Sequence, residues 1–122
     1  MSDEKDCSCR DHLKGSMSEK EAVKAMESLF GWVLMEKNGR LSLEKRYFFE
    51  DFKNGVVFCH YIADLAAQEN HHPVLQVSRT EVLIHWQTEH CQGLTDQDFK
   101  MAQYCDALLE SITTCEPEQN EA

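Results

Sequence analysis

Two neighbouring histidines are the side chains of this chain best suited to acid–base chemistry. His71 and His72 stand directly before Pro73, at the end of a predicted helix. Imidazole gains and loses a proton near neutral pH, and proline restricts the backbone that carries both rings. One ring can face a cleft while the other packs. The alternative is that one imidazole caps the helix C-terminus as a cation and the other is solvated.

A second group of proton-transfer candidates follows at the end of a predicted strand. Glu89 and His90 are adjacent there, and Asp98 comes shortly afterwards, at the start of a predicted helix. Either Glu89 or His90 has a side chain that can act as an acid or a base. Asp98 completes a Thr95-x-x-Asp98 capping box, so its carboxylate has a structural role available as well as a chemical one.

The cysteine and histidine spacing does not favour a metal site. Cys7 and Cys9 are too close for the usual zinc pattern, and we interpret them as thiols on a tail. His85, His90 and Cys91 follow one another along a single strand, which does not supply converging ligands. We therefore expect no bound metal.

Charge and hydropathy exclude several classes of function. The chain has 122 residues and a formal net charge of −10, which argues against a surface that binds nucleic acid or an anionic membrane. No apolar run approaches the roughly 20 residues of a membrane span, and the N-terminus is polar without a signal-peptide core. We therefore expect a cytoplasmic protein with reduced thiols.

Hydrophobic periodicity predicts the elements that must position these side chains. Amphipathic patterns preceded by capping residues predict helices at 18–30, 51–68 and 95–112. Alternating patterns predict two hairpins, the first turning at Asn38-Gly39, with strands at 32–35, 41–49, 75–77 and 82–88. The fold class is therefore α+β, with the order α-β-β-α-β-β-α. It comprises a four-stranded antiparallel sheet with three helices on one face.

The same patterns predict which side chains face the core and where the domain ends. On the last strand, Val82, Ile84 and Trp86 should point to one face, with Leu83 and His85 on the other. The central helix should bury a stripe of Phe52, Val56, Cys59, Ile62, Ala63 and Ala66. One domain is expected at 17–112, between a flexible N-terminal tail at 1–16 and a flexible acidic C-terminal tail at 113–122.

The order of these motifs resembles the pterin-4a-carbinolamine dehydratase family over about residues 17–112. The resemblance rests on Trp32, Tyr47-x-Phe49-x-x-Phe52, His71-His72-Pro73 and Thr88 followed by Gly93-Leu94-Thr95-x-x-Asp98. It implies a hydro-lyase that converts 4a-hydroxytetrahydrobiopterin to the quinonoid dihydropterin. Such an enzyme recycles a pterin by acid–base catalysis, without a metal or a redox cofactor. The resemblance also implies a homodimer or homotetramer.

By the same resemblance, His71 and His72 match the family's adjacent catalytic histidines. Pro73 and Asp98 match residues that line the substrate site, and Glu89 and His90 are the remaining catalytic candidates.

Two positions depart from the family pattern. Ala67 stands where a polar residue is usual, and the family's Thr-His pair is replaced by Thr88-Glu89-His90. A one-residue shift along a strand turns a side chain to the opposite face, so Glu89 takes the catalytic direction unless the strand has ended or bulges. Some family members have lost the dehydratase activity and bind proteins instead. The alternative function is therefore a non-catalytic protein with a protein client, such as a RuBisCO assembly factor.

Overall fold

The computed structural model describes residues 16–121, and the side chains of residues 16–112. The predicted N-terminal tail, with Cys7 and Cys9, lies almost wholly outside this range. The elements follow in the order α2 (Glu19–Ala25), the 3₁₀ helix η1 (Met26–Ser28), β1 (Val33–Lys37), β2 (Arg40–Phe48), α3 (Phe52–Glu69), β3 (Val74–Val77), β4 (Glu81–Trp86) and α4 (Asp96–Glu121). The predicted α+β class and element order are confirmed.

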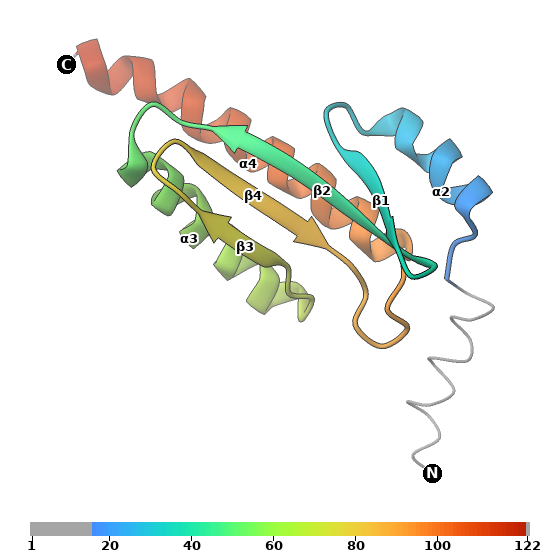
Figure 1. The fold of residues 1–122 in the computed structure, drawn as a ribbon. Helices are drawn as coiled ribbons and strands as arrows, with labels where there is room; N and C mark the ends of the chain where they lie inside the picture. The colour runs from blue at the N-terminus through green and yellow to red at the C-terminus, as the bar shows by residue number, and fades with distance from the viewer. Residues whose placement is uncertain (1–15, 122) are drawn as a thin grey trace.

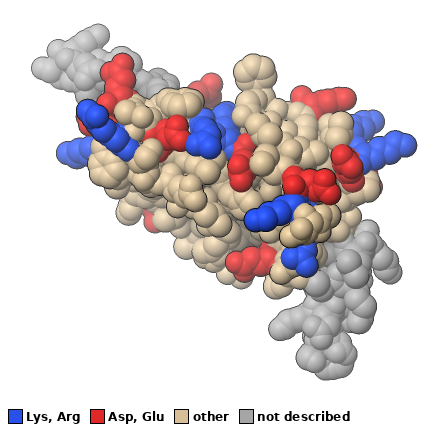
Figure 2. All heavy atoms as spheres, in the orientation of Figure 1, with Lys and Arg blue, Asp and Glu red and all other residues tan. Residues whose placement is uncertain are grey.

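The four strands form one antiparallel sheet in the order β1-β2-β4-β3. Figure 1 shows α3 and α4 lying behind the sheet and α2 lying beside β1. Helices therefore cover one face of the sheet. Figure 2 has the same orientation as Figure 1 and shows the side away from α3 and α4, where basic and acidic residues are interspersed with broad uncharged areas.

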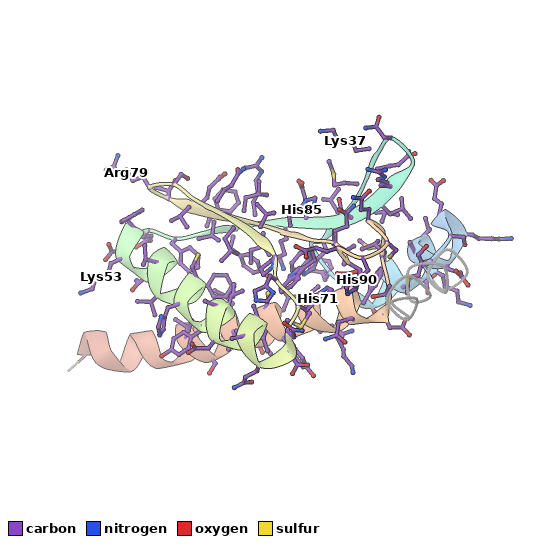
Figure 3. The ribbon with its side chains drawn as sticks, turned by 90° about the horizontal axis from the view of Figure 1, so that it is seen from below. Lys37, Lys53, His71, Arg79, His85 and His90 are labelled. Carbon is purple, nitrogen blue, oxygen red and sulfur yellow. The ribbon has the colours of Figure 1, made fainter. Side chains whose placement is uncertain are left out.

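Strand β4 carries the alternation that the sequence predicts. Val82, Ile84 and Trp86 are fully buried on the helical side, whereas Leu83 and His85 are only partly covered on the other side. Figure 3 shows the sheet edge-on, with His85 above it and His71 below it among the helices. The two faces of β4 therefore separate His85 from the group around His71.

The buried stripe of α3 differs from the predicted one. The residues that face the core are Gly55, Phe58, Ile62 and Ala66, while Phe52 and Val56 are 52% and 43% exposed and Ala63 is exposed too. The prediction was wrong at these three positions because Gly55 lets the helix approach the sheet closely. A Cβ at Gly55 would lie 3.3 Å from Cγ2 of Val82. This close approach turns the helix so that Phe58 packs against the rings of Tyr47 and Phe49.

Several element boundaries also shift. The first helix gives way to the 3₁₀ turn after Ala25, before the predicted end at Phe30. The Asn38-Gly39 hairpin turn is confirmed, with φ angles of 55° and 78°. Helix α4 continues to Glu121, beyond the predicted end at Ile112. The sequence placed that end early because Pro117 removes a backbone donor from the helix.

Candidate active site

Helix α3 ends in a way that directs His71 toward the core. Asn70 adopts a left-handed conformation, with φ 54° and ψ 43°, and its backbone N–H donates to the carbonyl of Ala66. The N–H of His71 donates to the same carbonyl at 3.1 Å. The backbone therefore turns at Asn70 and closes the helix three residues before Pro73. His71 leaves this turn with only 13% of its side chain exposed.

His71 meets the carboxylate of Asp98, which is fully buried. Nε2 of His71 lies 2.6 Å from Oδ1 of Asp98. The other carboxylate oxygen accepts a hydrogen bond from the Thr88 hydroxyl at 2.7 Å and one from the Thr95 N–H at 3.0 Å. A buried carboxylate needs such partners because it has lost its hydration. Asp98 is therefore held from three directions, by the end of α3, the segment after β4 and the start of α4.

The predicted capping box at the start of α4 is present in one arm only. Asp98 accepts from the Thr95 N–H as a capping box requires, but the Thr95 hydroxyl contacts the Thr88 hydroxyl at 2.9 Å instead of capping the helix. Because the Thr88 proton is directed at Asp98, Thr95 donates to Thr88. The two roles considered for Asp98 therefore coexist: it caps the helix and it contacts His71.

Trp86 is a member of this group that sequence reasoning missed. Its ring stacks on the His71 ring, with centroids 5.7 Å apart and planes 9° from parallel. The periodicity of β4 identified Trp86 only as a core residue. One feature of the sequence could have indicated this role. Trp86 and Thr88 are two residues apart along an extended segment, so their side chains lie on the same face and near the same partners.

The remaining predicted site residues flank this group. His72 is exposed and Pro73 is partly buried. Strand β4 ends at Trp86, and a hydrogen bond from the Thr88 N–H to the Gly93 carbonyl at 2.8 Å closes a turn that holds Glu89 and His90, both exposed. The strand has therefore ended before Glu89, so strand alternation does not decide between these two. The structure joins His71 to Asp98, and the roles of His72, Pro73, Glu89 and His90 stay predictions.

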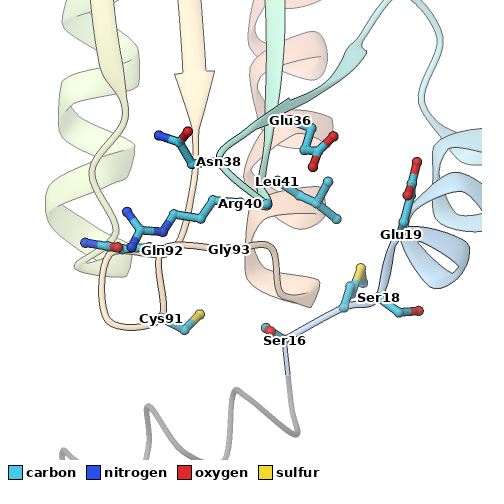
Figure 4. A pocket seen from close by; sticks show the side chains of 12 residues that line it. Ser16, Ser18, Glu19, Glu36, Asn38, Arg40, Leu41, Cys91, Gln92 and Gly93 are labelled. Atoms are coloured by element: carbon cyan, nitrogen blue, oxygen red, sulfur yellow. The ribbon is translucent and has the colours of Figure 1, made fainter.

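A separate hollow of about 470 Å³ is lined in part by the same turn. Figure 4 shows its lining, with Glu19 from α2, Glu36 and Arg40 from the first hairpin, and Cys91 and Gln92 from the turn. Neither His71 nor Asp98 lines it.

The described residues contain neither a metal-binding cluster nor a membrane-spanning helix. Within residues 16–112, whose side chains the structure describes, His, Cys, Asp and Glu form no group of three or more that could hold a metal ion. No helix within residues 16–121 is long and apolar enough to cross a membrane.

Comparison with known sequences identifies similar proteins. Residues 15–108 match the family model described as Pterin 4 alpha carbinolamine dehydratase. A Vibrio cholerae serotype O1 protein named "Putative pterin-4-alpha-carbinolamine dehydratase" is 39% identical over 109 residues, which is 88% of this chain and 99% of that protein. A Chlorobium luteolum protein of the same name is 30% identical over 105 residues, covering 86% and 91% of the two chains.

Comparison with solved structures gives a consistent result. A transcriptional coactivator/pterin dehydratase from Brucella melitensis superposes with a TM-score of 0.70 at 28% identity, over 77% of this chain and 98% of that one. A pterin dehydratase-like protein, identified as a RuBisCO assembly factor in the alpha-carboxysome, gives 0.55 at 23% identity, over 66% and 90%. The second likeness concerns the fold alone.

Proposed function

This chain belongs to the pterin-4-alpha-carbinolamine dehydratase family, and from that premise we propose that it dehydrates 4a-hydroxytetrahydrobiopterin to the quinonoid dihydropterin. The observation that carries the proposal is the 2.6 Å contact between His71 and the fully buried Asp98. An imidazole backed by a buried carboxylate is an arrangement suited to moving protons near neutral pH.

The reaction requires one proton to be supplied and one to be removed. The bond between C4a and its hydroxyl breaks, and the hydroxyl leaves as water after receiving a proton from an acid. N5 loses its proton to a base, and the electron pair of that N–H bond forms the double bond between N5 and C4a. No electron is exchanged with another molecule, so the step needs only an acid and a base.

The contacts of His71 fit the base. One oxygen of Asp98 already accepts two hydrogen bonds, and the other faces Nε2 of His71, so Nε2–H donates to the carboxylate. This leaves Nδ1 of His71 to accept the N5 proton, and the carboxylate balances the charge that the ring then gains. The acid that protonates the departing hydroxyl is one of His72, Glu89 and His90.

A variant panel assayed with 4a-hydroxytetrahydrobiopterin tests this proposal. We expect His71→Ala to lower kcat by about 10²–10⁴-fold, the usual cost of removing one positioned acid or base. Losses of the same order in His72→Ala, Glu89→Gln or His90→Ala would identify the acid. His60→Ala is the control, because His60 is an exposed histidine on α3 that lies 3.8 Å from Asp64 of the same helix. A His71→Ala protein as active as the His60→Ala control would refute the assignment.

A non-catalytic role in protein assembly is the second candidate. The observation that favours it is the exposed Glu89, which occupies the place of the histidine in the family's Thr-His pair. If the folded wild-type protein accelerates the dehydration no more than buffer does, this candidate replaces the first.

A further inference from the structure

We infer that Trp86 is a positioning residue for His71, an inference that rests on the proposed dehydratase function. Its indole ring sets the plane of the imidazole, so that the nitrogen left free by Asp98 points in one direction.

The stack supplies a restraint that the hydrogen bond does not. The contact with Asp98 fixes Nε2 of His71, but the ring can still rotate about the line from that atom to its Cβ. The near-parallel indole, with planes 9° apart and centroids 5.7 Å apart, opposes this rotation because tilting the imidazole toward the indole closes the space between the two rings. Trp86 is itself enclosed, since it is fully buried and paired with Leu43 across β2 and β4. Together, Asp98 and Trp86 restrict both the position and the plane of the ring.

Stability alone does not account for an indole at this position. The Trp86 N–H is buried without a hydrogen-bond partner among the described residues, and the thiol of Cys105 near it is a weak acceptor. An unsatisfied buried donor is destabilising. Val82 and Ile84 fill the same face of β4 with no such donor. The contact that distinguishes Trp86 from these neighbours is its stack on His71.

Kinetics of three variants test the inference. Trp86→Leu removes the flat ring, Trp86→Phe keeps one, and Ile84→Val trims the same strand face without removing a ring contact of His71. We expect Trp86→Leu to lower kcat about tenfold or more with KM nearly unchanged, since small misplacements of a catalytic group are costly. Trp86→Phe should recover most of the loss, and Ile84→Val should match wild type. If Trp86→Leu does not fold, Trp86→Met takes its place.

Proton NMR of the His71 ring gives a readout that does not depend on activity. The stacked indole should shift the His71 ring protons upfield, with signals assigned by their absence in His71→Ala. The shift should disappear in Trp86→Leu and persist in part in Trp86→Phe. A wild type that lacks dehydratase activity but shows this shift would overturn the proposed function and leave the restraint intact. Unshifted His71 signals, or wild-type kcat in a folded Trp86→Leu protein, would overturn the inference.

Discussion

At His71, three different parts of the chain act on one imidazole. Asn70 turns it out of the helix, Asp98 binds one nitrogen and Trp86 covers one face. Asp98 has to be a carboxylate, because both of its oxygens accept hydrogen bonds. One oxygen accepts from Thr88 and Thr95, and the other accepts from His71.

Asp98→Asn tests that requirement directly. The amide matches the carboxylate in shape but places an N–H₂ group against either His71 or the two threonine donors. We expect kcat to fall about 10²-fold or more, because the histidine loses the partner that fixes its tautomer. Asp96→Asn, an exposed acid in the same helical turn, should retain full activity. Equal rates in the two variants would contradict the role given to Asp98.

The sequence predicted part of this site and missed part of it. His71 and Asp98 were found because their residue types and motif spacing indicate chemistry. Trp86 was not found because periodicity reports burial and says nothing of which buried side chains touch. The sequence left open whether Glu89 or His90 faces the site, because the answer depends on where β4 ends. The alternation pattern specifies the ends of elements poorly.

At the scale of the elements, α3 shows where pattern reasoning fails. The helix has apolar residues on more than one face. The pattern predicted a stripe that included Phe52, Val56 and Ala63, whereas the close packing at Gly55 turns Phe58 into the core.

Two lysine substitutions on α3 distinguish the stripes. Ala63→Lys should leave Tm within a few degrees of wild type, because Ala63 is exposed. Ala66→Lys should lower the free energy of unfolding by about 3 kcal/mol or more, since it puts an unpaired charge into the core. Thermal unfolding of both proteins measures the difference, and equally large losses in the two proteins would restore the predicted stripe, which contained Ala63 as well as Ala66.

Lys45 breaks the apolar alternation of β2, and the structure explains why. Its Nζ binds Oδ1 of Asp106 at 2.9 Å and lies 4.7 Å from the centre of the Tyr47 ring. Asp106 also accepts from the Trp32 indole N–H and from the Tyr47 hydroxyl. The network joins the segment before β1, strand β2 and helix α4 through one carboxylate, so a charged residue on the core face is satisfied.

Because of this network, the free energy of unfolding should fall at high pH. Burial, and then the hydrogen bond to Asp106, raises the pKa of Tyr47 above its usual value. The folded state therefore keeps a proton that the unfolded chain releases above about pH 10. Stability is complete below that pH and falls above it. We expect Tm to decline between about pH 10 and 11, and less steeply in Tyr47→Phe; equal slopes for the two proteins would contradict this.

On the scale of the whole molecule, one sheet face remains open to solvent. Val33, Met35 and Phe48 are exposed there around a hollow of about 280 Å³. Further apolar side chains, including Phe52 and Val56, are exposed on α3. A domain of this size has a high ratio of surface to volume and commonly gains stability by association.

We therefore expect the protein to form a homodimer or homotetramer, as the family resemblance implies. Light scattering coupled to size exclusion should give at least twice the 14.1 kDa chain mass at micromolar concentration. A particle of single-chain mass would show that these surfaces remain solvated.

The most direct test of the central claim is chemical rescue of the site by free imidazole. The wild-type protein should dehydrate 4a-hydroxytetrahydrobiopterin well above the spontaneous rate, and His71→Gly should lose about 10²–10⁴-fold of that activity. Added imidazole should restore part of the lost rate in His71→Gly and none in Asp98→Asn, because only the first has an empty space beside an intact carboxylate. Wild-type turnover at the spontaneous rate, or a His71→Gly protein as active as wild type without imidazole, would contradict the account.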